Sequence, residues 1–186
     1  MSAKTIVAET EDKMKKSLEV VGHNIAAVRT GRANSGMVEH LKVEAYGSMM
    51  PMRQVANVSI PEPRTILLTP WDPGVLKSLE KAINDSDLGL PPIVDGKQIR
   101  LSIPPLTRER REEMVKIVHK LAEEGRVSMR SIRRDANEKV KTLEKDKTIT
   151  EDESFKAQAE IQKTTDRYIG QIDQTQASKE KDLTQG

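Results

Sequence analysis

The chain has 186 residues, of which 35% are hydrophobic and 32% are charged, a balance typical of long exposed helices around a modest core. It contains no cysteine, which excludes disulfides and thiolate metal sites. A formal net charge of +2, with one tryptophan, two tyrosines and one phenylalanine, argues against a protein that coats nucleic acid by bulk charge or stacks bases on aromatic rings.

The N-terminal stretch mixes acids with lysines over residues 1–16 and has no apolar run. It therefore lacks the pattern of a signal peptide or of a transmembrane segment. We expect a cytoplasmic protein.

Proline divides the chain into three parts. All nine prolines lie between Pro51 and Pro105, whereas residues 1–30 and 106–186 contain none. Because proline breaks helix interiors, the flanks can form long helices and the middle cannot.

Three helices are predicted in the flanks. In the first, valine or methionine recurs every seven residues as in a coiled coil, at Val7, Met14, Val21 and Val28, with Leu18 and Ile25 between them. The second is expected from Thr107 to about Lys145, with Gly125 as its only weak point. Thr150 and Glu153 form a capping box that starts the third, whose thin apolar line comprises Phe155, Ile161, Tyr168, Ile172 and Leu183.

The middle section alternates apolar and polar residues as half-buried strands do. Strands are expected at 41–45, 55–60, 65–69 and 99–103, with one helix that begins at Asp72-Pro73. Because helical stripes need partners, the flanking helices should pack on one another. The predicted fold class is α+β: a discontinuous three-helix bundle, residues 1–30 and 105–186, with an inserted β/α/β sandwich at 31–104.

Two crossings connect these domains, and their residues predict a hinge. The outbound segment contains Thr30, Gly31 and Arg32, and the inbound segment contains Ile103, Pro104 and Pro105. Glycine tolerates a sharp turn, whereas consecutive prolines hold an extended conformation. We expect an L-shaped molecule with restricted bending.

Sequence signatures of catalysis are missing. There is no phosphate-binding loop, no dinucleotide-binding turn, no H-E-x-x-H pair among the three histidines and no G-x-S-x-G elbow. We therefore expect neither an enzyme nor a protein with a metal or another cofactor.

The most distinctive feature is a basic face on the second helix. At about 100° per residue, six side chains share one arc of roughly 100° that contains no acid of its own between Arg126 and Lys141: Arg126, Arg130, Arg133, Arg134, Asn137 and Lys141. Such a face either keeps a helix soluble or binds an anion. Arginine favours the anion, because its planar fork matches phosphate oxygens.

Four segments resemble the ribosome recycling factor family: RTGRA at 29–33, SDLGL at 86–90, IPPLTRERR at 103–111 and IRRDANEKVK at 132–141. The resemblance covers essentially the whole chain and implies a factor similar to transfer RNA in size and shape. Such a factor binds the post-termination ribosome through large-subunit ribosomal RNA. With elongation factor G and GTP it promotes subunit dissociation and release of messenger and transfer RNA, and it hydrolyses nothing itself.

The resemblance also indicates site residues. The family's critical RNA-contacting arginines match Arg130 and Arg133, and Arg29 matches a position near the joint between the domains. Arg126, Arg134, Asn137 and Lys141 are added from helical geometry. We expect a monomer whose partners are the ribosome and elongation factor G, with no membrane or DNA.

An alternative from another class is a helical protein-protein adaptor whose arginines meet an acidic partner surface. An adaptor would keep an apolar seam for its partner helix. Here the apolar seams are expected to be buried among the three helices of the chain itself.

Overall fold

The computed structural model describes residues 2–185 and divides the chain into two compact units. One comprises the chain up to Thr30 together with Arg108–Gln185, and the other comprises Gly31–Thr107. Residues 105–107, which the sequence places with the helices, thus lie in the second unit.

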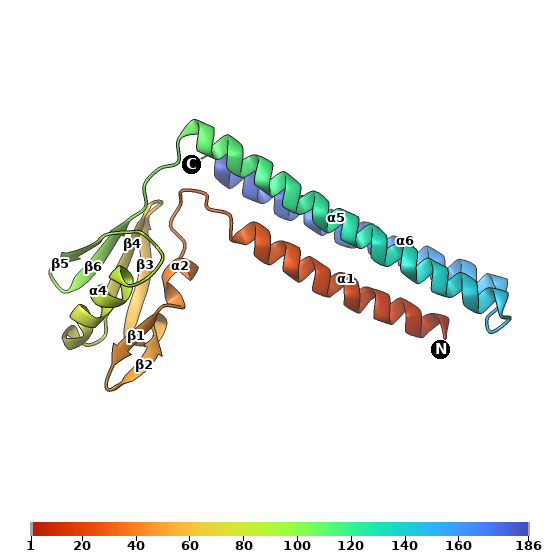
Figure 1. Cartoon of the computed structure of the whole chain (residues 1–186), viewed down its shortest axis with the longest axis horizontal. Helices are drawn as coiled ribbons and strands as arrows, with labels where there is room; N and C mark the ends of the chain where they lie inside the picture. Colours follow the sequence, from red (N-terminus) through yellow and green to blue (C-terminus); the bar gives the residue numbers. More distant parts are fainter. Residues whose placement is uncertain (1, 186) are drawn as a thin grey trace. The chain divides into compact units, whose positions relative to one another are not determined.

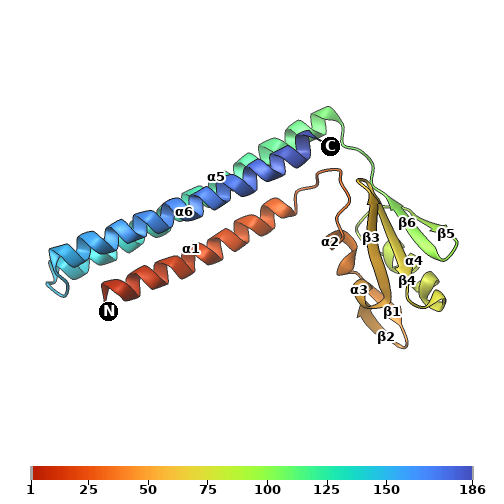
Figure 2. The same ribbon diagram turned by 180° about the vertical axis from the view of Figure 1, so that it is seen from behind.

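The first unit is a bundle of three helices, α1 (Ala3–Ala26), α5 (Arg108–Lys145) and α6 (Glu151–Thr184). Figures 1 and 2 show α5 and α6 running antiparallel and joined by a short loop, with the N-terminal end of α1 at the same end of the bundle. The second unit interrupts the bundle in sequence. The predicted α+β class, a three-helix bundle with an inserted α/β unit, is confirmed.

The bundle core follows the predicted seams with one correction. In α1, Ile6 and Thr10 are buried in addition to the predicted seam, whose Val7 is partly buried against the same core; the Thr10 hydroxyl donates to the Ile6 carbonyl at 2.6 Å, which satisfies it inside the core. In α6, Phe155 is 72% exposed, so its predicted place in the apolar line is wrong. Phe155 lies about 120° around the helix from Ile161, at about 100° per residue.

The ends of the long helices are set by their caps. Thr150 Oγ1 accepts a hydrogen bond from Glu153 N at 3.2 Å, while Glu153 Oε2 accepts one from Thr150 N at 2.8 Å, so the predicted capping box of α6 is confirmed. Ser2 caps α1 in a similar way through Thr5 N. α5 runs unbroken through Gly125, despite its predicted weakness there.

The second unit contains two antiparallel sheets. β1 (Lys42–Ala45) pairs with β2 (Ser48–Pro51), and a four-stranded sheet has the order β3 (Ala56–Glu62), β4 (Thr65–Pro70), β6 (Gln98–Ser102), β5 (Pro92–Asp95). The helical elements are α2 (Gly36–Glu39), α3 (Met52–Val55), the 3-10 turn η1 (Pro73–Val75) and α4 (Leu76–Asn84).

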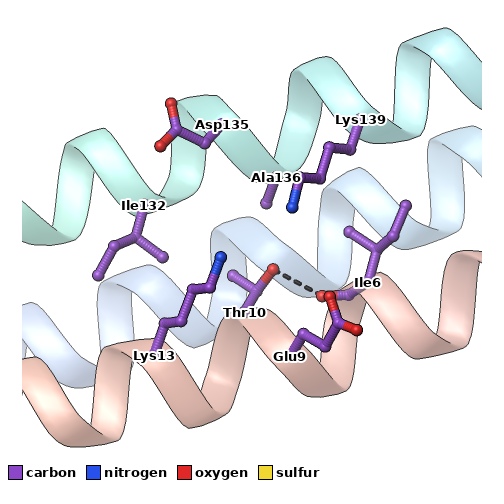
Figure 3. Close-up of a pocket in the computed structure, with 8 residues that line it drawn as sticks. All are labelled: Ile6, Glu9, Thr10, Lys13, Ile132, Asp135, Ala136 and Lys139. Carbon is purple, nitrogen blue, oxygen red and sulfur yellow. Dashed lines mark hydrogen bonds between the residues drawn. The ribbon is translucent and has the colours of Figure 1, made fainter.

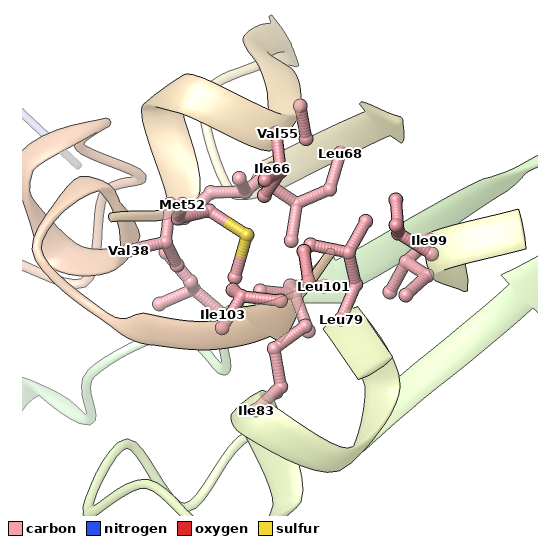
Figure 4. Close-up of a cluster of buried hydrophobic side chains, with 14 residues drawn as sticks. Val38, Met52, Val55, Ile66, Leu68, Leu79, Ile83, Ile99, Leu101 and Ile103 are labelled. Carbon is pink, nitrogen blue, oxygen red and sulfur yellow. The ribbon is translucent and has the colours of Figure 1, made fainter. Parts of the chain in front are cut away.

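All four predicted strands are present, and the proline-flanked strands β2 and β5 were not predicted. Asp72 starts η1 as expected, because its carboxylate accepts from Gly74 N at 2.9 Å. Figure 4 shows one apolar core to which both α4 and the large sheet contribute; its side chains include Leu79, Ile83, Leu68 and Leu101. All side chains of this core belong to the unit of residues 31–107.

Candidate nucleic-acid interface

The predicted basic arc lies on the edge of α5 that faces α6. Met129, Ala136 and Val140 of α5 are buried in the bundle. The arc begins beside them and extends around the helix toward solvent. Its residues therefore differ in exposure, from Arg126 next to α6 to Arg134 and Lys141 in solvent.

Arg126 is the most enclosed member, with a side chain only 17% exposed. Its Nε donates to Glu123 Oε2 at 2.8 Å, and its Nη1 donates to Asp173 Oδ1 at 2.8 Å and to Gln176 Oε1 at 2.9 Å. These bonds, chiefly the one to Glu123, raise the pKa of Arg126. The expectation that no carboxylate neutralises the arc is therefore wrong at Arg126.

Arg130 shares the same carboxylate. Its Nη1 lies 3.2 Å from Glu123 Oε1, and both side chains are about half exposed, at 44% for Arg130 and 52% for Glu123. The hydrogen bonds from Arg126 and Arg130 lower the pKa of Glu123. One carboxylate thus bridges two guanidinium groups.

The remaining cations of the arc are free of ion pairs. Within residues 2–185, no carboxylate lies in salt-bridge range of Arg133, Arg134 or Lys141. Arg133 makes only a long contact of 3.4 Å with Gln162 Oε1, and Arg134 and Lys141 are exposed. These three cations are available to an external anion.

Asn137 lies at the inner side of the arc. Its Oδ1 is buried and accepts no hydrogen bond from the described part of the chain. The residue as a whole is half-buried.

The α6 side of this edge has carboxylates and amides. Asp173 and Gln176 hold Arg126, and Gln162 donates to Asp166 Oδ1 at 2.9 Å. Gln176 also contacts His119 Nδ1 at 2.8 Å, while His119 Nε2 lies 2.8 Å from Glu180. The α6 side of the arc thus carries negative and neutral polar groups.

The opposite edge of α5, toward α1, is different. Figure 3 shows a groove there with Lys13 and Lys139 alongside Glu9 and Asp135. The two cations and two anions balance, so the basic surface does not continue onto this edge.

Sequence reasoning missed Glu123 and Asp173. Glu123 lies three residues before Arg126 and seven before Arg130, a helical spacing at which side chains meet, so the sequence contained this signal. Asp173 comes from another helix, and its pairing depends on the register between α5 and α6. Nothing in the sequence specified that register.

The structure places the other predicted residues near the chain crossings. Arg29 is exposed beyond the end of α1. Thr30 is the last residue of the N-terminal part of the helical unit. Gly31 has φ +75°, and Arg32 is half-buried. Ile103 is buried and donates its N–H to Arg64 O at 2.8 Å, and Pro104 and Pro105 are exposed.

Residues 2–185 contain no group of three or more histidines and carboxylates arranged to hold a metal ion. In the same part of the chain, none of the helices combines the length and apolarity needed to cross a membrane. The fold and the basic edge together define the class: a two-unit α+β protein whose helical bundle presents arginines to solvent.

Comparisons with known proteins identify the family. A family model described as ribosome recycling factor matches residues 21–183. The ribosome-recycling factor of Symbiobacterium thermophilum is 52% identical over 97% of both chains, and that of Thermus thermophilus is 50% identical over 98% of this chain and 99% of its own. The chain belongs to the ribosome recycling factor family.

Solved structures agree with this assignment. A solution structure of the ribosome recycling factor is 41% identical and superposes with a TM-score of 0.81, covering 100% of this chain and 99% of its own. Models of the T. thermophilus factor, bound with E. coli elongation factor G to the E. coli post-termination complex, are 50% identical with a TM-score of 0.67, covering 98% of this chain and 99% of their own. The adaptor alternative is not favoured.

Proposed function

We propose that this protein recycles ribosomes after termination. It binds the post-termination ribosome and, with elongation factor G and GTP, promotes separation of the subunits and release of messenger and transfer RNA. The observation that supports this most directly is the nearly full-length match to a factor that has been described with elongation factor G on that complex. The protein acts in the cytoplasm as a monomer.

The bundle contacts large-subunit ribosomal RNA through the α5 arc. Arg133, Arg134 and Lys141 have no ion-pair partner within residues 2–185, and the first two offer planar forks that match phosphate oxygens. Contacts of this kind position a protein on a nucleic-acid backbone without reading its bases. Binding therefore depends strongly on salt and weakly on sequence.

The unit of residues 31–107 receives the action of elongation factor G. The segments 29–32 and 103–105 act as the hinge, and Arg29 adds a phosphate contact beside it. GTP hydrolysis belongs to elongation factor G, and this protein hydrolyses nothing. The subunits then separate because this protein and elongation factor G bind one conformation of the ribosome better than another.

The experiment is equilibrium binding to isolated large ribosomal subunits across a salt series. Arg133→Ala should weaken binding about tenfold or more, since a hydrogen bond between charged groups contributes about 1.5–3 kcal/mol. The slope of log affinity against log salt should fall by about 1. Arg53→Ala, an exposed arginine in α3 of the other unit, is the matched control and should bind like the wild type. Equal affinity of Arg133→Ala and wild type would show that the arc is not part of the interface.

A further inference from the structure

Glu123 is an acid at the N-terminal end of the basic arc. A carboxylate on an RNA-binding face opposes binding. Glu123 nevertheless lies within hydrogen-bond distance of both Arg126 and Arg130.

The two carboxylate oxygens of Glu123 are divided between two arginines. Oε2 of Glu123 accepts from Arg126 Nε at 2.8 Å and Oε1 accepts from Arg130 Nη1 at 3.2 Å, so each oxygen serves one guanidinium. Carboxylates and phosphates both accept charge-assisted hydrogen bonds from arginine, and here the carboxylate accepts one such bond from each guanidinium. The carboxylate of Glu123 therefore occupies the place where a phosphate would join the same two side chains.

Arg126 would remain in place if Glu123 left. Its Nη1 is held separately by Asp173 Oδ1 and Gln176 Oε1 from α6, and its side chain is only 17% exposed. The Nε side of the guanidinium is thus presented toward Glu123 by a fixed anchor. Binding an external anion there would require no reorganisation of Arg126.

Glu123 has fewer anchors than Arg126. Its side chain is 52% exposed, and within residues 2–185 its only ion pairs are those with Arg126 and Arg130. Exposed ion pairs contribute little net stability because water and salt compete with them. Replacing this carboxylate with a phosphate therefore costs little free energy, provided that the incoming phosphate is held by further contacts.

We propose that Glu123 is an internal competitor for phosphate: it neutralises Arg126 and Arg130 in the free protein and is displaced when ribosomal RNA docks on the arc. The proposal rests on the proposed function, because it takes the arc as the RNA-binding face. Displacement of Glu123 would make the arc selective for one RNA surface over others. An RNA that makes the full set of arc contacts displaces the carboxylate, whereas an RNA that offers only scattered phosphates does not.

The test compares Glu123→Gln with Glu124→Gln. Both remove one negative charge from the same turn of α5, and Glu124 has no ion pair within residues 2–185, so the second variant measures the effect of bulk charge alone. Affinity is measured for isolated large ribosomal subunits and for polyuridylate as a non-cognate polyanion, each over a salt series.

Glu123→Gln should bind both RNAs more tightly than Glu124→Gln, by about threefold on the large subunit and by a larger factor on polyuridylate, so the ratio of the two affinities falls. Its salt dependence should also steepen by up to about 1 in slope, because salt ions rather than the carboxylate then occupy the site and are released on binding. A merely structural role would not change this slope.

A second measurement repeats Glu123→Gln in an Arg126→Ala, Arg130→Ala background, where its advantage over Glu124→Gln should disappear. The proposal is overturned if the two single variants bind alike, if Glu123→Gln binds more weakly than wild type, or if its advantage persists without the two arginines. Failure of the proposed function has a different signature: Arg133→Ala and wild type would then bind the large subunit equally.

Discussion

Gly125 of α5 lies against Val21 of α1 so closely that a Cβ built on the glycine would be 2.6 Å from Cγ2 and 3.0 Å from Cγ1 of the valine. The same Cβ would lie 3.2 Å from Cδ1 of Ile172 in α6. The three helices therefore meet at a position where only a hydrogen atom fits. Glycine at this site is a packing requirement of the bundle.

Gly125→Ala should destabilise the protein. Alanine would add up to about 1 kcal/mol of helix propensity, but overpacking a core costs about 1–3 kcal/mol, and here the clashing atoms belong to a stiff β-branched side chain. The free energy of unfolding, measured by urea denaturation, should fall by about 1–2 kcal/mol.

Gly170→Ala in α6 and Gly22→Ala in α1 are matched controls, because nothing lies within 4 Å of a Cβ at either position. Each should leave stability unchanged or raise it by up to about 1 kcal/mol. Adding Val21→Ala to Gly125→Ala should remove the penalty of the alanine relative to Val21→Ala alone. A gain in stability from Gly125→Ala in the wild-type background would contradict this account of the packing.

The cap of α6 can be tested separately. Thr150→Ala removes the hydroxyl that accepts from Glu153 N, and loss of an N-cap hydrogen bond costs about 1 kcal/mol. Thr148→Ala, in the loop before the cap, is the control and should change little. Equal stability of both variants by urea denaturation would show that the cap contributes nothing.

Glu153 makes this cap pH-dependent. Hydrogen bonds from Thr150 N–H and from the Thr150 hydroxyl lower the pKa of the Glu153 carboxyl in the folded protein. In the unfolded chain the same group has a pKa of about 4.3 and binds a proton first. Its stabilising contribution is thus complete above that pH and is lost as pH falls through the lower, folded value.

Glu153→Gln should therefore lose stability relative to wild type at pH 7, and this difference should shrink as the pH is lowered below about 5. Urea unfolding of both proteins between pH 7 and pH 3 provides the comparison. Glu151→Gln, which leaves the capping box intact, should show no such convergence. A difference that stayed constant with pH would count against the hydrogen-bonded carboxylate as its cause.

Gly31 is constrained in two ways within the unit of residues 31–107. Its φ is +75°, and a Cβ would lie 3.2 Å from Leu106 Cγ and 3.3 Å from Leu106 N. Gly31→Ala should cost about 1–3 kcal/mol in that unit. Gly47→Ala shares the positive φ, at +77°, but has nothing within 4 Å of the new Cβ, and it should cost less. The reverse order by hydrogen exchange or denaturation would argue against the contact with Leu106.

Much of the fold could be predicted because its signals are local. Proline placement separates the units, Thr150 and Glu153 mark the start of α6, and Asp72 marks the start of η1. The bundle follows because apolar stripes must be buried. These features depend on residues close together in sequence.

The errors come partly from contacts between distant segments and partly from helical positions that were not worked through. Gly125 was expected to weaken the helix because helix propensity takes no account of how closely α1 packs against α5 at this residue. Phe155 was assigned to the core from its residue type although its angle around α6 directs it to solvent, where it is 72% exposed. Arg126 was taken as free although Glu123 lies three residues before it, and its second carboxylate, Asp173, joins it only through the packing of α5 on α6.

The central claim is that this protein separates the subunits of post-termination ribosomes in cooperation with a GTPase. The most direct measurement is light scattering of such ribosomes mixed with this protein, with and without elongation factor G and GTP. Rapid loss of scattering should require all three components and should slow severalfold with Arg133→Ala. Splitting that does not depend on this protein, or its failure when all three are present, would contradict the claim.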